Sequence, residues 1–242
     1  MSFSASIITL FPELFPGPLG ASVIGRGLAD GLWSLQTVQL RDFARDRHHT
    51  VDGTPAGGGP GMVLKPDVLA DAIDSISGPD DPRPRFLMSA RGAPLNRDMA
   101  HEISRGPGAL IVCGRFEGVD ERIIKARDLV EISVGDYVLA GGEVAAMVLL
   151  EASLRLISGM LGSAESAGDE SFERGLLEYP QFTRPQSFEG REIPKILTSG
   201  DHGKIDAWRR AEAGRLTADR RPDLADKLPA PHAPAGRKKM DS

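Results

Sequence analysis

Hydrophobic and polar positions divide the first two thirds of the chain into short apolar runs and helical patterns that alternate. Partly β-branched runs of four to six residues predict strands at residues 6–10, 36–40, 85–88, 109–113 and 129–134. Such runs are typical of strands buried on both faces. Helical patterns occupy residues 22–30, 66–75, 96–104 and 120–126, and a longer apolar one follows at 143–157. Strands that alternate with helices predict an α/β fold with a mainly parallel sheet.

The pattern changes after residue 161, and this change predicts three parts. Residues 1–161 form the α/β domain, and the small, polar, acidic residues 162–174 are typical of a mobile linker. Residues 175–242 are expected to form a smaller, mostly helical C-terminal domain, with one helix over 201–216 and a short one opened by Arg220, Arg221 and Pro222. The composition of residues 229–242 is typical of a disordered tail.

Composition narrows the class of protein. The 242 residues carry a formal net charge of -5, yet residues 183–242 hold 13 Lys and Arg against 9 Asp and Glu. This asymmetry suggests two parts with different partners, although solvated charged faces explain it equally well. No apolar stretch reaches the roughly 18 residues of a membrane span, and the N-terminus lacks a basic region, so we expect neither membrane association nor secretion. With one cysteine, Cys113, the chain is expected in the reducing cytoplasm.

Common signatures of covalent or metal catalysis are missing from the sequence. It contains no GxSxG, HExxH, GxxxxGK[ST] or strand-linked GxGxxG motif, and its five histidines are scattered apart from one adjacent pair. Cys113 ends an apolar strand, where a packed thiol is the expected role. We therefore expect neither a nucleophilic residue nor a protein-bound metal.

Three glycine-rich segments are candidates for ligand contact. In residues 57–61 four of five residues are glycine, and the preceding arginines and histidines favour a loop that meets phosphate or base edges over a merely flexible one. Residues 113–118 (CGRFEG) and 133–143 (SVGDYVLAGGE) each follow a predicted strand. In open α/β sheets, ligands bind beyond the carboxyl ends of strands. Backbone groups there can read an adenine edge, with Tyr137 and Leu139 flanking the ring, although an irregular connection remains the alternative.

A charged pair of positions suggests acid–base chemistry. Arg155 lies near the end of the long helix, and Asp169 and Glu170 lie in the linker. A carboxylate on a mobile segment can act as a general base, and an arginine can stabilise an oxyanion. Alone the pattern is weak, because linkers are often acidic and helix ends often carry arginine.

Taken together, these segments resemble the bacterial tRNA (guanine-N1)-methyltransferase family of the SPOUT superfamily. The resemblance runs in order from ITLFPELF through RDFARDRHHTVD, GGGPGM, CGRFEGVDERI and SVGDYVLAGGE to GLLEYPQFTRP, SGDHGKIDAWR and RRPDL. It implies a parallel sheet with a deep trefoil knot and a homodimer with sites at the subunit interface. It also implies S-adenosylmethionine as methyl donor, and as target N1 of the tRNA guanosine 3′ of the anticodon (position 37). The family is associated with a magnesium requirement.

The resemblance assigns roles to particular positions. Arg155 matches the catalytic arginine, and the general base is an aspartate whose position holds Glu170 here; either Glu170 or its neighbour Asp169 takes that role. Gly59 and Glu178 are expected to bind the substrate, and Arg209 and Arg210 to hold the tRNA backbone. The expected cofactor-binding residues are Leu87, Ser89, Gly92, Gly114, Phe116, Glu117, Val134, Gly135, Asp136, Tyr137, Val138, Leu139, Gly141 and Gly142.

Three other functions are alternatives on the sequence. The first is a SPOUT enzyme that acts on a ribose hydroxyl or on ribosomal RNA, and the second is an RNA-binding protein that keeps the fold without catalysis. The third is a regulator that binds a small-molecule cofactor, which would not need the basic C-terminal part. The glutamate at position 170 keeps the second alternative open, because it places the carboxylate one methylene further from the backbone than the family's aspartate does.

Overall fold

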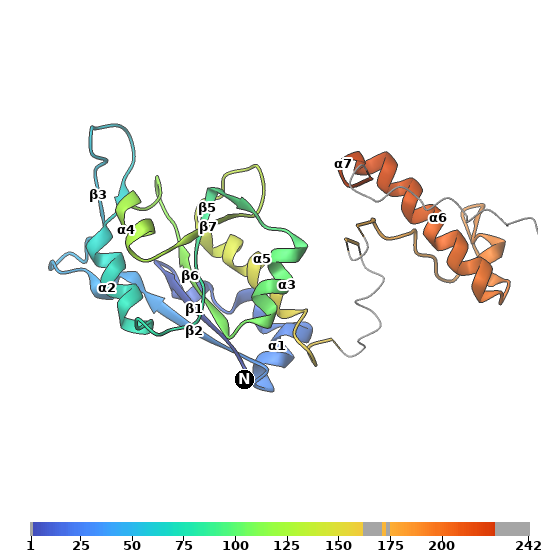
Figure 1. Ribbon diagram of the computed structural model, residues 1–242, viewed down its shortest axis with the longest axis horizontal. Coiled ribbons are helices and arrows are strands. Elements are labelled where there is room, and N and C mark those ends of the chain that lie inside the picture. The colour runs from blue at the N-terminus through green and yellow to red at the C-terminus, as the bar shows by residue number, and fades with distance from the viewer. Residues whose placement is uncertain (1, 162–170, 173–174, 226–242) are drawn as a thin grey trace, which may run out of the picture. The chain divides into compact units, whose positions relative to one another are not determined.

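The computed structural model describes residues 2–161, 171–172 and 175–225. The chain divides into two compact units, Met1–Ala164 and Glu165–Ser242, which are described separately below (Figure 1). Of the predicted linker, residues 162–174, only 171 and 172 are described, and the predicted tail lies outside the described residues.

The first unit contains a five-stranded parallel sheet, as the alternation of strands and helices predicts. The spatial order is β2-β1-β6-β5-β7, and each neighbouring pair is parallel. The strands are β1 (Phe3–Thr9), β2 (Trp33–Gln39), β5 (Arg85–Pro94), β6 (Gly108–Cys113) and β7 (Val130–Ser133). All six residues of β6 are buried, because this strand lies in the middle of the sheet and is covered on both faces.

Helices cover both faces of the sheet (Figure 1). On one face α1 (Ser22–Ala29), α3 (Arg97–Arg105) and α5 (Gly142–Leu154) pack on a core that includes Ile7, Ile111 and Leu149. On the other, α2 (Pro66–Ile76) and α4 (Glu121–Ala126) pack on Ile8 and Leu110. Short 3₁₀ helices occur at Pro12–Leu14, Gly17–Gly20 and Leu40–Phe43. Strand β3 (Asp52–Gly53) pairs antiparallel with β4 (Val63–Leu64).

Local sequence signals set several helix starts as predicted. The side chain of Asn96 accepts a hydrogen bond from the backbone N–H of Met99 and caps α3, and Pro66 occupies the first turn of α2. The bounds of α1 to α4 agree with the predicted ranges to within one residue.

Four predicted ranges of the first unit were wrong at their ends. Strand β1 begins at Phe3 rather than at residue 6, because Ser4 interrupts the apolar run while its backbone still pairs with both neighbouring strands. Strand β2 begins at Trp33 rather than at residue 36, because this edge strand alternates polar and apolar residues instead of forming a continuous apolar run. Helix α5 ends at Leu154 rather than at residue 157, since the backbone beyond it turns more tightly: Ile157 N–H donates to Leu154 O (3.0 Å). Strand β5 continues past Met88 to Pro94 through an irregularity in its pairing with β7.

The second unit is described from residue 171. It contains a small antiparallel pair, β8 (Ser187–Phe188) and β9 (Arg191–Glu192), a 3₁₀ helix at Lys195–Thr198, and helices α6 (His202–Arg220) and α7 (Pro222–Ala225). Helix α6 is longer than the predicted 201–216, and Asp201 caps its start. Thr217, which is buried in α6, accepts a hydrogen bond from the backbone N–H of Leu177 (2.8 Å) and fixes the preceding segment on the helix.

None of the helices found among the described residues combines the length and apolar character that crossing a membrane requires.

Candidate functional site

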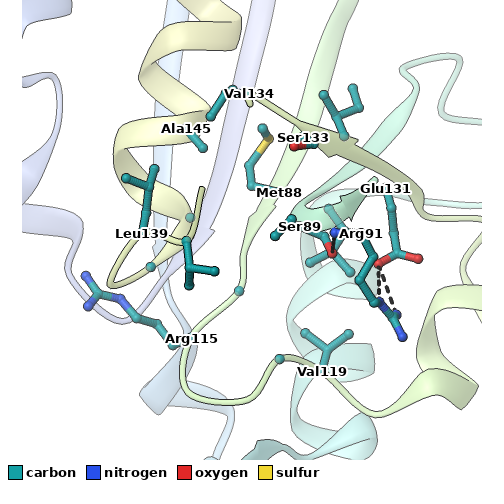
Figure 2. A pocket seen from close by; sticks show the side chains of 18 of the residues that line it. Met88, Ser89, Arg91, Arg115, Val119, Glu131, Ser133, Val134, Leu139 and Ala145 are labelled. Carbon is teal, nitrogen blue, oxygen red and sulfur yellow. Dashed lines mark hydrogen bonds and ion pairs between the residues drawn. The ribbon is translucent and has the colours of Figure 1, made fainter. Parts of the chain in front are cut away.

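A pocket of about 310 Å³ opens at the carboxyl ends of β5, β6 and β7 (Figure 2). Since these three strands are parallel neighbours, the loops that leave them meet at one edge of the sheet. Residues 87–91 form the first wall of the pocket, and residues 114–119 form the second wall. Residues 131–135 and 137–142 form the third wall, and Ala145 of α5 also lines the pocket. The position is the one that the glycine-rich segments predict.

Most of the expected cofactor positions meet in this pocket. Only Gly92 and Asp136, of the fourteen named above, do not line it. Gly92 lies directly behind the wall: its Cα approaches the backbone of Glu131 and Ile132 so closely that a Cβ would overlap it. Asp136 is exposed on the loop between two lining residues.

The loop from Val134 to Gly141 presents apolar side chains to the pocket mouth. Val138 is 87% exposed and Tyr137 is 57% exposed, although both are large and apolar. The hydroxyl of Tyr137 donates to the carbonyl of Val134 (3.0 Å) and closes the loop on itself. Gly135, with φ +151°, leaves the space that the Tyr137 ring occupies. Exposed apolar groups in a concave, backbone-rich loop are typical of a small-molecule site.

Gly142 joins the start of α5 to the end of β6. Its backbone N–H donates to the carbonyl of Gly114 (2.9 Å), and a Cβ at this position would stand 2.8 Å from Cys113 Cα and 2.9 Å from Gly114 N. These neighbours are backbone atoms, which cannot rotate away as a side chain can. A glycine is therefore required at position 142 for two walls of the pocket to meet.

Replacing Gly142 with alanine should consequently destabilise the protein by about 1–3 kcal/mol, the usual cost of forcing an extra methyl group into a packed site. Chemical denaturation measures this loss. Gly78→Ala is the matched control, because a Cβ there meets nothing within 4 Å. Equal stabilities of the two variants would show that the backbone between β6 and α5 accommodates the extra methyl group without loss of stability.

The glycine-rich loop between β3 and β4 is bonded to the second pocket wall. Glu117 N–H donates to the carbonyl of Met62 (2.9 Å), and Leu64 N–H donates to the carbonyl of Gly118 (3.0 Å). Gly59 is exposed at φ +120°, a conformation that favours glycine. The structure thus places two of the three segments singled out in the sequence side by side.

A buried carboxylate behind the pocket was missed by sequence reasoning. Glu143, 1% exposed, accepts a hydrogen bond from Thr9 Oγ1 (2.7 Å) and pairs with Arg115, whose side chain lines the pocket. The signal available in the sequence is a charged residue at the first position of a mainly apolar helix pattern. Its partners are remote in the chain, so the sequence could not identify them.

An exposed ion-pair group forms the opposite side of the pocket (Figure 2). Arg91 contacts Glu131 and Glu121 at 3.0 Å each, with 63% of its side chain exposed. The hydrogen bonds that Arg91 donates to Glu121 and then to Glu131 raise its pKa above the ordinary value. Surface pairs of this kind contribute little to stability.

Asp120 anchors the far end of the second wall. Its carboxylate accepts from Arg122 N–H (2.9 Å), caps α4 and pairs with the Arg122 guanidinium (2.7 Å). Hydrogen bonds from the Arg122 side chain, and then from its backbone, lower the pKa of Asp120 from 3.8 to about 2. Because the folded-state pKa is depressed, this stabilisation is present above the unfolded-state value and is lost as the pH falls towards 2.

Asp120→Ala should therefore cost about 1 kcal/mol of unfolding free energy at neutral pH, the usual value of an N-cap. The difference from wild type should shrink between pH 4 and pH 2, as denaturation at several pH values would show. Asp120→Asn keeps the cap acceptor and should retain most of the stability at neutral pH. A difference from wild type that stays constant down to pH 2 would contradict this account of the charge.

The remaining sequence-predicted residues do not line the pocket. Arg155 directly follows the last residue of α5 and is half-buried. Asp169 and Glu170 lie outside the described residues. In the second unit, Glu178 is exposed and accepts from Gln181 (2.6 Å), Arg210 is exposed, and the Arg209 guanidinium stacks 5.0 Å from the Tyr179 ring centroid. Part of Arg209 therefore serves the packing of its own unit.

Two observations bear on other chemistries. Cys113 is buried, and burial, followed by the charge of Glu143, raises the pKa of its thiol well above the ordinary value, which agrees with the expected packed thiol. Within the described part of the chain, no three His, Cys, Asp or Glu side chains gather as a metal site would require.

Comparison with known proteins identifies the family to which the chain belongs. The sequence model of a family described as tRNA (Guanine-1)-methyltransferase TrmD matches residues 1–227. A protein of Chelativorans sp. (strain BNC1), named tRNA (guanine-N(1)-)-methyltransferase, is 62% identical over 224 residues, which is 93% of this chain and 95% of that protein. A protein of the same name from Mesorhizobium japonicum is 61% identical over 224 residues, which is 93% of this chain and 97% of that protein. Another, from Rhodopseudomonas palustris (strain TIE-1), is 61% identical over 230 residues, which is 95% of this chain and 92% of that protein. The chain therefore belongs to the tRNA (guanine-N1)-methyltransferase family.

Proposed function

We propose that this protein transfers the methyl group of S-adenosylmethionine to N1 of the tRNA guanosine that lies 3′ of the anticodon. The observation that carries the proposal is the match to the family over residues 1–227, together with a pocket built from the segments that the resemblance singles out. Relatives at about 60% identity carry the corresponding enzyme name.

The pocket fits the methyl donor in size and chemistry. Its volume of about 310 Å³ lies at the lower end of the range for small-molecule sites, and it combines apolar side chains with backbone groups from three loops. Leu87, Gly114, Tyr137 and Leu139 would hold the adenosyl part, and the glycines at 141 and 142 leave room for close backbone approach. When bound, S-adenosylmethionine supplies an activated methyl group on a positively charged sulfur.

The chain's own residues must then prepare the guanine. N1 of guanine carries a proton at neutral pH, so a base must remove it, and we assign this role to Glu170 or Asp169. Negative charge develops on O6 as the proton leaves, and the Arg155 guanidinium would stabilise it. The other task of the protein is alignment of the two substrates, which is an orientation effect and needs no covalent intermediate.

The distance along α5 supports a homodimer with sites at the subunit interface. Gly142 at the start of the helix lines the pocket, and Arg155 follows the helix end. Thirteen residues at a rise of 1.5 Å separate these ends by about 20 Å. One chain therefore does not bring the arginine to its own pocket through α5. The same helix exposes Val144 (56%) and Val148 (44%), an apolar strip that a second copy would cover.

The finer architecture follows from the same family relation. We propose that the first unit carries the SPOUT trefoil knot, as the match to the family over residues 1–227 implies. We propose that residues 1–161 bind the cofactor, that 162–174 link the domains, and that residues 175–242, whose described part contains α6 and α7, bind tRNA. Arg210 would contact the phosphate backbone, and Glu178 and Gly59 the target nucleotide.

We propose no magnesium site in this protein. The described residues offer no cluster of ligands for it, so we route no step through the metal. The protein is expected to act in the cytoplasm, where tRNA is found.

Transfer of labelled methyl from S-adenosylmethionine to unmodified tRNA transcripts tests the proposal. One transcript carries guanosine 3′ of the anticodon and the other carries adenosine there. We expect incorporation into the first alone. Incorporation into both would indicate a different RNA target, and incorporation into neither, with cofactor binding retained, would favour a non-catalytic RNA-binding protein.

A further inference from the structure

Arg115 makes contacts that no role assigned so far explains. Its side chain lines the pocket, 19% exposed, on the side opposite Arg91 (Figure 2). The guanidinium pairs with both carboxylate oxygens of Glu143: Nε lies 3.2 Å from Oε1, and a terminal nitrogen lies 2.9 Å from Oε2. The other terminal nitrogen donates to the carbonyl of Ala140 (3.2 Å). One side chain thus joins the second pocket wall, the third wall and α5.

We propose that Arg115 is a positioning residue, which holds the loop of residues 134–141 in the conformation that binds the methyl donor. The inference rests on the proposed function for the identity of the ligand. It deepens that function by naming a residue outside the expected set that controls cofactor affinity.

The ion pair is built to fix the guanidinium in one place. Glu143 is buried and is held by Thr9 Oγ1 at 2.7 Å, and Thr9 is itself fully buried at the end of β1. The Phe11 ring lies beneath the guanidinium, with its centroid 4.3 Å from the central carbon. A two-point contact with a carboxylate and a stack on an aromatic ring restrict both the position and the plane of an arginine.

The fixed guanidinium in turn determines the loop. Its hydrogen bond to the carbonyl of Ala140 acts immediately before Gly141, and a Cβ at Gly141 would collide with the Arg115 side chain. The loop backbone therefore lies directly against the guanidinium. The exposed residues Tyr137 and Val138 stand only a few residues upstream, so their placement depends on this anchor.

If the ion pair of Arg115 and Glu143 served stability alone, its removal would have effects on stability and on cofactor affinity different from those that the positioning role predicts. Removing Arg115 alone leaves Glu143 buried without its counter-charge, which destabilises any protein whatever the role of the loop. Removing both charges together with neutral side chains of similar size avoids that cost. It does not restore the hydrogen bond to Ala140. Stability and cofactor affinity should therefore separate in the double variant.

The test compares Arg115→Met, and Arg115→Met combined with Glu143→Gln, in the full-length protein. Melting temperature reports stability, and calorimetric titration reports the Kd for S-adenosylmethionine. We expect the single variant to lose both. The double variant should regain most of the melting temperature, while its Kd stays raised about tenfold, the order of one hydrogen bond from a charged group.

A largely buried pair away from the pocket provides the matched control. Arg83 contacts Asp81 at 2.7 Å, with exposures of 13% and 12%, and neither residue lines the pocket. Arg83→Met with Asp81→Asn should alter the melting temperature and leave the Kd unchanged. Arg115→Lys is a second probe, because it keeps a charge beside Glu143 and loses the fork that also reaches Ala140; we expect near-normal stability and a raised Kd.

Hydrogen exchange of residues 134–141 in the ligand-free protein separates this inference from the proposed function. We expect faster exchange in the Arg115 variants and not in the Arg83 control, even if the wild-type protein fails to bind S-adenosylmethionine and the proposed function is wrong. Wild-type Kd and wild-type exchange in a stable double variant would overturn the positioning role.

Discussion

Replacing Arg155 with alanine should reduce kcat for methyl transfer by about 10²–10³, while the Kd for S-adenosylmethionine changes little. The loss is of the size found when one group that stabilises a developing oxyanion is removed. The Kd should stay because Arg155 does not line the pocket of its own chain. Steady-state rates at saturating tRNA and S-adenosylmethionine measure kcat, and a cofactor titration measures the Kd.

Arg155→Lys is the conservative companion, since it retains the positive charge and loses the planar fork of the guanidinium. It should fall between the wild type and the alanine variant. Parallel losses of kcat, cofactor affinity and melting temperature in Arg155→Ala would instead assign a structural role to this residue at the end of α5.

The same variant also tests the subunit arrangement. If Arg155 of one chain serves the pocket of the other, mixing Arg155→Ala chains with Gly142→Ala chains creates dimers that carry one intact site. Two variants that are each impaired should then regain measurable activity on mixing. Activity that stays at the level of the separate variants would place Arg155 and its pocket in the same chain.

The strands of the central sheet could be predicted from the sequence because most of them are buried on both faces. Residues 109–113 form a continuous apolar run, and β6 accordingly lies in the middle of the sheet. The range predicted for the edge strand β2 began three residues too late. This strand contacts one neighbour only, so polar residues such as Ser34 and Gln36 alternate with apolar ones. Periodicity reports burial, and it reports strand ends poorly. The predicted start of β1, which lies inside the sheet and is mostly buried, was also three residues late.

The sequence predicted where the pocket lies, but it did not predict all of the residues that form and support it. Glycines after strands mark sites of close backbone approach, and Gly114 and Gly142 are indeed adjacent across two walls. Arg115 and Glu143 were missed, because their pairing and the contact from Thr9 join residues 28 and 134 positions apart. Local sequence patterns carry no information on such contacts.

Glu170→Gln should slow methyl transfer by about 10²–10⁴, the usual contribution of a general base, and should do so far more than Asp169→Asn. Each change replaces a carboxylate by an amide of nearly the same size, so the ability to accept the N1 proton is lost with little change in shape. Rates at saturating tRNA and S-adenosylmethionine isolate this step from binding.

Glu170→Asp is the decisive companion, because it places the family's aspartate at this position. If Glu170 is the base, the shorter carboxylate should retain activity well above the glutamine variant. If Asp169 is the base, its asparagine variant should be the slower of the two amides, and Glu170→Asp should behave like wild type. A protein in which neither amide slows transfer would have its base elsewhere, and the carboxylates of residues 169 and 170 would then be a solvated acidic segment.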